Sequence, residues 1–285
     1  MKQSFKVEIW KATHNTYFIV SLLVGVILVL CNVLATYANV SDLTNRSIAC
    51  QNAGLPVYRF TGCSLFIWWI AHNGINFGSV YFFQIWPIVA SLPFSWSLAT
   101  EGHSGAIVQF LTRTNRRRWY ISKYLAVFFS GGIAMASPLL LDLLINALIC
   151  PAEPLMFANA LTTVTNRSFL SNLFFSHPWI HALLWCGMDY LFGGAAAVLT
   201  FFLGTRIRKS IAAILFPFSI MYACSIFSDT LKELFGTALE LNPIQLAMQA
   251  PLGINPGWLL FVFLTFPTLT SFFCGYRRVV NDDIL

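Results

Sequence analysis

The sequence predicts an all-α, polytopic integral membrane protein that forms a single domain over residues 1–285, and three observations lead to this fold class. Hydrophobic residues make up 57% of the chain and charged residues only 10%, whereas soluble domains are about 25% charged. So few charges cannot cover a surface that faces water. The 27 Phe and 9 Trp residues favour a bilayer and its interfaces. Finally, six stretches are long and apolar enough to form transmembrane helices.

Each transmembrane helix must cross a hydrocarbon core of about 30 Å, which takes roughly 20 apolar residues. A polar lead precedes the first apolar stretch and no small-residue cleavage pattern follows it, so we expect a retained span and not a signal peptide. The fourth stretch contains the run Phe192–Ala197, whose small residues permit close helix packing. The six predicted spans lie at approximately 18–38, 76–97, 120–149, 179–204, 209–228 and 257–276.

The distribution of Lys and Arg predicts the orientation. With six spans both termini share one side, and 13 of the 17 basic residues fall there, at positions 2, 6, 11, 113, 116, 117, 118, 123, 206, 208, 209, 277 and 278. The other side holds Arg46, Arg59, Arg167 and Lys232. The positive-inside rule therefore predicts cytoplasmic termini, in the cell membrane. Anionic headgroups account for the net charge of +6, so membrane lipids are expected partners and nucleic acid is not.

Three outer loops are predicted at roughly 39–75, 150–178 and 229–256. The first contains the Trp-rich segment Cys63–Gly74, which is too short to span and is expected either to lie in the outer interface or to re-enter as a short helix. The segment Asn242–Pro256 has a similar character. Cys50 and Cys63 share the first loop and either form a disulfide, if the compartment is oxidising, or remain two free thiols.

Metal and nucleotide chemistry find little support in the sequence. No two of the seven Cys form a CxxC pair. His177 and His181 have helical spacing, but the Glu of a zincin helix is missing, and Pro178 suits the first turn of a membrane helix. No Lys follows a Gly, so the chain lacks a phosphate-binding loop. We therefore expect no metal and no catalytic residue, and any ATP-driven work would need a partner protein.

One cytoplasmic segment carries an ordered pattern. Residues Ala99–Ala126 give an acidic residue, a Ser-Gly pair, an apolar run, a basic cluster, an aromatic residue and a Lys that enters the next span. This order resembles the first cytoplasmic loop of type-2 ABC export permeases. The segment Phe5–Phe18 resembles the amphipathic elbow helix of the same family. The first outer loop is larger than that of the plainest members, and its Trp-rich segment is a second departure.

The resemblance implies a permease subunit of an ABC exporter with an elbow helix at 4–16 and a coupling helix in the loop 98–118. Such a helix docks on a separate ABC ATPase, which would carry ATP and Mg, so this chain would hold no cofactor and would not itself be an enzyme. A second permease, of the same or a sister chain, completes the assembly. The implied coupling residues are Glu101, Ser104, Gly105, Val108, Phe110, Leu111, Arg113 and Arg117.

Glu101 has a specific expected role, and the basic cluster has two possible roles. Glu101 is expected to cap the start of the coupling helix and to meet a basic residue of the partner. The basic cluster Arg116–Arg118 either contacts the partner or only anchors the topology.

Charged residues within the spans are costly and usually face a bundle interior or a wet cavity. Asp142 lies in the third predicted span with Asn146 one turn later, and Asp189 lies in the fourth with Trp185 one turn earlier. These four residues are candidates for a translocation path. The alternative is that the two carboxylates make purely structural polar contacts.

The absence of a charged pore lining favours an apolar or amphipathic substrate. The resemblance suggests an antimicrobial peptide, a drug or a lipid-like molecule, with immunity to lantibiotics as one setting. Two other classes remain open. One is a membrane-embedded lipid-modifying enzyme, although the acidic residues are scattered and the His residues lack acidic partners in the sequence. The other is a non-catalytic membrane sensor or assembly factor.

Overall fold

The computed structural model describes residues 2–54, 64–104, 115–155, 163–165, 168–207, 209–236, 240–249 and 256–281. Every regular element within these ranges is a helix, which confirms the predicted all-α class. The helices are α1 (Lys2–Thr13), α2 (Thr16–Asn52), α3 (Leu65–Trp68), α4 (Phe77–Ser91), α5 (Ser97–Ser104), α7 (Arg116–Ile149), α8 (Ser171–Ser176), α9 (Pro178–Leu203), α10 (Ser210–Phe235), α11 (Pro243–Ala247) and α12 (Gly257–Asn281).

Five of the described helices, α2, α7, α9, α10 and α12, are long and apolar enough to cross a membrane. They indicate a multi-pass membrane protein. The predicted span 76–97 is different, because α4 has 15 residues and ends at Ser91. That length is roughly 22 Å of helix, less than the hydrocarbon core of about 30 Å. The chain turns after Ser91, where Pro93 has no amide hydrogen to continue the helix.

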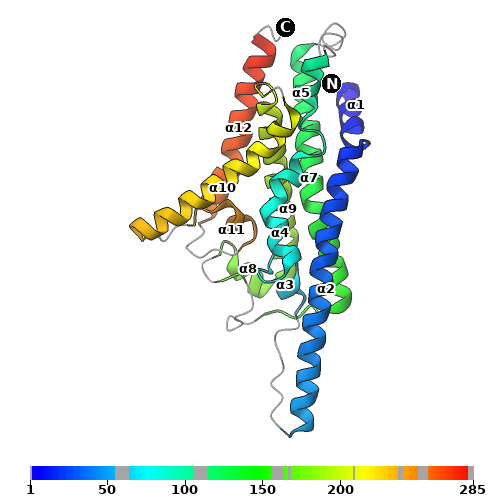
Figure 1. Ribbon diagram of the computed structural model, residues 1–285, viewed down its shortest axis with the longest axis vertical. Helices are drawn as coiled ribbons and strands as arrows, with labels where there is room; N and C mark the ends of the chain where they lie inside the picture. Colours follow the sequence, from blue (N-terminus) through cyan, green and yellow to red (C-terminus); the bar gives the residue numbers. More distant parts are fainter. Residues whose placement is uncertain are drawn as a thin grey trace.

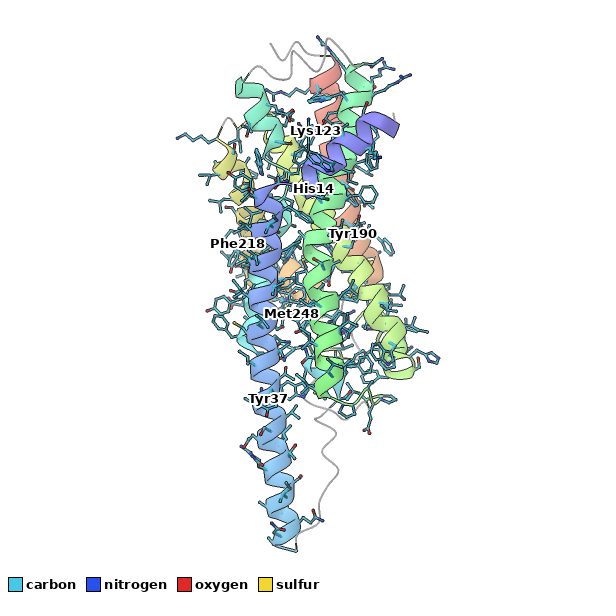
Figure 2. The ribbon with its side chains drawn as sticks, turned by 90° about the vertical axis from the view of Figure 1, so that its right-hand side faces the viewer. His14, Tyr37, Lys123, Tyr190, Phe218 and Met248 are labelled. Atoms are coloured by element: carbon cyan, nitrogen blue, oxygen red, sulfur yellow. The ribbon has the colours of Figure 1, made fainter. Side chains whose placement is uncertain are left out.

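Helix α2 is much longer than the predicted first span. Its 37 residues correspond to roughly 55 Å, and the first part of the predicted outer loop 39–75 is therefore helical. Beyond Tyr37, α2 extends past the ends of the other long helices (Figures 1 and 2). At its start, the Asn15 side chain accepts a hydrogen bond from the amide of Phe18 (2.8 Å) and donates one to the carbonyl of Pro93 (2.9 Å). Asn15 thus joins the α1–α2 junction to the turn after α4.

The helices form an elongated bundle with α7 and α9 at its centre. Helices α1 and α2 pack on α7, α4 packs between α2 and α9, and α12 packs on α9. Helix α1, helix α5, the start of α7 and the last turns of α12 all lie at one end of the bundle (Figure 1). Helix α10 contacts α4 and α9 but runs obliquely away from the bundle toward its C-terminal end (Figure 1).

Glycine residues bring α7 and α9 into close contact. A Cβ atom on Gly131 of α7 would lie 2.4 Å from the Cβ of Ala197, and a Cβ on Gly193 of α9 would lie 2.6 Å from the Cβ of Met135. Neither position has room for a larger side chain. This confirms the close packing predicted from the run Phe192–Ala197.

The Trp-rich segment lies inside the bundle over its described part, Ser64–Gly74. It forms α3 and a turn, and all residues from Leu65 to Ala71 are buried. The indole N–H of Trp69 donates a 2.9 Å hydrogen bond to the carbonyl of Leu139 in α7. The segment is therefore covered by other parts of the bundle and includes a short helix, which agrees with one of the two expectations. Its depth in the membrane, including the interfacial position, stays a prediction.

Candidate functional site

The carboxylate of Asp142 is the centre of a buried polar cluster. One carboxylate oxygen accepts a hydrogen bond from the side-chain amide of Asn32 in α2 (2.9 Å). The other accepts from the backbone amide of Ile70 (2.7 Å) and from the side-chain amide of Asn146 (2.9 Å). Asp142, Asn32 and Asn146 are all fully buried. Three donors satisfy the carboxylate where water cannot, which is the general requirement for a buried charged or polar group.

The cluster continues from Asn32 into α4 and the Trp-rich segment. The side-chain amide of Asn32 also donates to the carbonyl of Trp68 (3.1 Å), and its oxygen accepts from Asn76 (3.0 Å). Asn76 further contacts the hydroxyl of Thr36 at 3.4 Å. Hydrogen bonds thus connect α2, α7, the start of α4 and the short α3 segment. This arrangement holds the internal segment at a fixed depth in the bundle.

A row of aromatic rings leads from this cluster to α9. The ring of Trp69 contacts His72 (centroids 4.6 Å apart), His72 contacts His181 (5.2 Å), and His181 stacks on Trp185 (6.0 Å, 8° between planes). The indole N–H of Trp185 donates to the carbonyl of Ala247 at the end of α11 (2.9 Å). Asp142, Asn146 and Trp185, predicted from separate spans, therefore belong to one connected region, and residues 69–72 connect them.

His72 lies outside the five long helices and is fully buried. Burial, and secondarily the nearby His181 ring, lower the pKa of His72 well below its ordinary value because both disfavour the protonated ring. Its Nδ1 atom lies 3.2 Å from the carbonyl oxygen of Phe66. The side chain of Gln249, whose φ is +52°, lies 3.3 Å from Nε2 of His181. Within the described residues no group of three or more His, Cys, Asp or Glu side chains could hold a metal ion.

Asp189 differs from Asp142. It lies one turn beyond Trp185 on α9 and is also fully buried, but neither carboxylate oxygen has a hydrogen-bond partner among the described residues. An unpartnered buried carboxyl is expensive, and such groups within membrane helices commonly mark a transport or proton path. The hydrogen bonds of Asp142 agree with the alternative that this carboxylate has a structural role. Asp189 has no hydrogen bonds among the described residues that would support a structural role.

At the end of the bundle that holds both α1 and α5, a buried ion pair joins α5 to α7. The ammonium group of Lys123 pairs with the carboxylate of Glu101, and the Lys123 side chain is fully buried (Figure 2). The rings of Phe94 and Trp119 lie 5.4 and 5.2 Å from the ammonium nitrogen. Glu8 of α1 is also buried at this end of the bundle and pairs with Lys11 at 3.4 Å.

One expectation about the cytoplasmic segment needs correction. Helix α5 begins at Ser97, so Glu101 lies inside the helix and does not cap its start. Its carboxylate pairs with Lys123 of the same chain, and the expected contact with a basic residue of a partner stays a prediction. Ser104 is the last residue of α5. The other predicted coupling residues, Gly105, Val108, Phe110, Leu111 and Arg113, lie outside the described residues.

Helix α7 begins with three arginines at positions 116–118, and its first turn contains no acidic residue. The side-chain oxygen of Asn115 caps the helix by accepting from the amide of Arg117 (3.0 Å). Arg117 and Arg118 are exposed. Cations at a helix N-terminus oppose the helix dipole by about 0.3–1 kcal/mol each. Helix stability therefore does not explain this cluster, and an anionic surface outside the chain would.

The remaining predicted pair cannot be assessed, since Cys63 lies outside the described residues. Cys50 lies near the end of α2, and the disulfide stays a prediction.

Several residues of the site carry no strong local signal. Asn32, Asn76 and His72 are single polar residues in apolar surroundings, and only their distant partners reveal their roles. Asn32 had one usable signal, since a lone Asn in the middle of an apolar span seldom lacks a partner in the bundle.

The fold and its buried polar contacts define an all-helical, multi-pass membrane protein. A family model described as "Protein of unknown function (DUF2705)" matches residues 66–285, and the chain belongs to this family. Neither the curated proteins nor the solved structures yielded a match.

Proposed function

We propose that the chain is the membrane-spanning permease subunit of an ABC exporter. In this proposal α1 is the elbow helix, α5 begins the coupling segment, and α4 with the turn that follows it takes the place of the second predicted span, 76–97. Both termini would be cytoplasmic in the cell membrane. Separate ABC ATPase subunits would bind ATP and Mg, and a second permease would complete the path for an apolar or amphipathic substrate.

The observation that carries the proposal is the ion pair between Glu101 and Lys123. A coupling segment must transmit movement to the spans, so it needs a firm connection to at least one of them. The pair gives α5 such a connection to α7, and Asn15 connects the α1–α2 junction to the adjoining turn through Pro93. The exposed arginines at the start of α7 lie at the same end and suit an acidic protein surface or anionic headgroups.

Asp189 and Trp185 supply the candidate path within the membrane. They share one face of the central helix α9, and Asp189 has no partner among the described residues. A carboxyl without a polar partner suits passage of an amphipathic substrate better than passage of ions, which use rings of charged or carbonyl groups.

The test is recovery of an ATPase on the tagged chain, after co-expression with the ABC ATPases of its own genome, together with ATP turnover in vesicles. Reversing the exposed charges, Arg117→Glu with Arg118→Glu, should lower recovery while membrane expression stays normal. Gly105→Trp, in the predicted coupling segment, should do the same. Arg46→Glu at the opposite end of the bundle is the matched control and should recover the ATPase fully.

Failure of the unmodified chain to recover any ATPase, or full recovery with both cytoplasmic variants, would contradict the proposal. Orientation is checked separately with single cysteines. On intact cells an impermeant thiol reagent should label Arg46→Cys and leave Asn115→Cys unlabelled. The reverse pattern would place the α5 end outside the cell and would exclude docking of a cytoplasmic ATPase there.

A further inference from the structure

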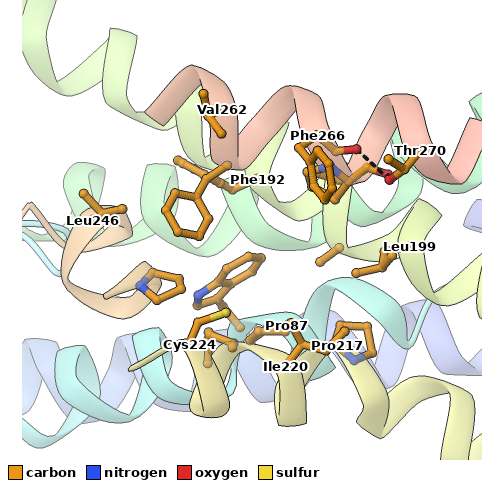
Figure 3. Close-up of a pocket in the computed structure, with 17 residues that line it drawn as sticks. Pro87, Phe192, Leu199, Pro217, Ile220, Cys224, Leu246, Val262, Phe266 and Thr270 are labelled. Carbon is orange, nitrogen blue, oxygen red and sulfur yellow. Dashed lines mark hydrogen bonds between the residues drawn. The ribbon is translucent and has the colours of Figure 1, made fainter. Parts of the chain in front are cut away.

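A cavity of about 360 Å³ lies between α4, α9, α10 and α12 and is closed at one end by α11. Figure 3 shows Phe192 of α9, Cys224 of α10, Leu246 of α11 and Val262 of α12 directed into the same space. Four of the lining residues are prolines, one each from α4, α10, α11 and α12, at positions 87, 217, 243 and 267. Pro87, Pro217 and Pro267 lie inside their helices, where proline removes a backbone hydrogen bond, whereas Pro243 begins α11.

The lining is apolar, and of two polar groups in it one has a hydrogen-bond partner and the other has none. The hydroxyl of Thr270 donates to the carbonyl of Phe266 within α12 (2.6 Å). Trp86 also lines the cavity, and its buried indole N–H has no acceptor among the described residues. A buried Trp N–H normally has a partner, and leaving it without one costs about 1–3 kcal/mol. The nitrogen itself is covered, so a small turn of the Trp86 side chain would bring its N–H to an acceptor that a ligand carries into the cavity.

The side of the cavity that α10 and α12 form reaches the surface of the bundle. Three lining residues are also exposed on the surface of the bundle: Ile220 by 38%, Val262 by 48% and Phe266 by 68%. Their helices are two of the five that are suited to cross a membrane, and α10 diverges from the bundle (Figure 1). A ligand that enters between them would come from the hydrocarbon of the bilayer and not from water.

We propose that this cavity binds one acyl chain of a membrane lipid, with the ester carbonyl of the chain accepting the hydrogen bond from Trp86. The volume is near the lower limit of ligand pockets, about 300–1,000 Å³, so one chain fits and a folded peptide does not. A helix of a second copy, about 10 Å wide, is also too large to enter. The inference goes beyond the proposed export function, since it requires neither an ATPase nor transport.

The test uses the full chain in detergent and a monoacylglycerol whose chain carries a photoreactive diazirine. Illumination should label peptides of α9, α10 and α12 that line the cavity, and unlabelled monoacylglycerol should compete. Cys224→Trp, which fills the cavity, should abolish the competed labelling. Ile226→Trp is the matched control, because Ile226 lies on the same helix and is 66% exposed, and it should label normally. Ala196→Leu fills the cavity from α9 and serves if Cys224→Trp does not fold.

The hydrogen bond is tested with Trp86→Phe, which keeps an aromatic ring and removes the donor. This variant should bind the ester probe roughly 2- to 12-fold more weakly, as expected for one net hydrogen bond, and should bind an alkyl ether analogue as the wild type does. Labelling that survives both cavity-filling variants would overturn the proposal. So would labelling lost when two copies associate, because the cavity would then belong to an interface. Recovery of an ATPase has no bearing on either result.

Discussion

The side-chain amide of Asn32 and the carboxylate of Asp142, 110 residues apart in the sequence, form a buried hydrogen bond of 2.9 Å between α2 and α7. The backbone amide of Ile70 binds the other carboxylate oxygen. One aspartate therefore fixes the internal Trp-rich segment between two long helices, and it does so with donors that have no access to water.

Asp142→Ala should destabilise the protein strongly. Three donors would lose their acceptor, and each buried donor left without one costs about 1–3 kcal/mol. Asp142→Asn should also destabilise, because its NH₂ group would face a donor at one of the two oxygen positions. Thermal unfolding in detergent measures both effects. Asp42→Ala is the matched control: Asp42 is 58% exposed and pairs with Arg46 on α2, and an exposed pair contributes about 0–1 kcal/mol. Equal shifts for the two alanine variants would show that the buried cluster adds no stability.

The ion pair of Glu101 and Lys123 leads to an asymmetric prediction. Glu101→Gln leaves a fully buried ammonium group without its main counter-charge, and breaking a buried pair in this way typically costs about 3–5 kcal/mol. Lys123→Met keeps most of the side-chain volume and removes the charge, so its cost should be much smaller. Expression level and thermal unfolding of the two variants compare them directly. A larger loss with Lys123→Met than with Glu101→Gln would mean that the pair is not the main contact of Lys123.

Some parts of this structure can be predicted from the sequence and others cannot. The difference depends on whether the interaction joins residues that are near or distant in sequence. Hydropathy is a local property, and it located the five long helices. The small residues of the run Phe192–Ala197 likewise predicted the close packing at Gly193. Hydropathy also made one predicted span too long, because the residues around Pro93 are as apolar as α4 although the helix ends before them. The cost of a buried charge marked Asp142 and Asp189 before their surroundings were known.

Long-range partners were beyond such reasoning. Lys123 follows three arginines and looks like one more cytoplasmic charge, but its position in α7 turns it toward Phe94 and Trp119, inside the bundle. The pairing of Glu101 with Lys123 inside the chain was accordingly not predicted. The path from Trp69 through His72 to Trp185 requires contacts between two segments distant in sequence, which no local pattern contains.

Gly131→Ala should lower stability because the added methyl group would lie 2.4 Å from the Cβ of Ala197 and 2.9 Å from the carbonyl oxygen of Ala90. Helices α7 and α9 would have to separate, and overpacking of this kind typically costs about 1–3 kcal/mol. Gly187→Ala is the matched control on α9, since nothing lies within 4 Å of its added Cβ. It should be neutral or stabilising by up to about 1 kcal/mol, because Ala is the better helix former. Thermal unfolding that ranks Gly187→Ala below Gly131→Ala would contradict the close contact of the two helices.

Stability should fall as the pH drops below about 6.5, the ordinary pKa of histidine, and His72 should contribute to that fall. Burial holds the pKa of His72 in the folded protein well below its ordinary value, so the unfolded chain binds a proton that the folded chain refuses. The contribution is therefore fully present above pH 6.5 and is lost as the pH falls toward the folded pKa, by at most about 1.4 kcal/mol per pH unit. His72→Asn keeps a donor for the Phe66 carbonyl and cannot titrate, so its unfolding temperature should change less between pH 8 and pH 5. His14→Asn, at an exposed position, is the matched control variant. A His72→Asn profile identical to that of the wild type would show that His72 is protonated equally in both states, and the buried contact with His181 would then have to be wrong.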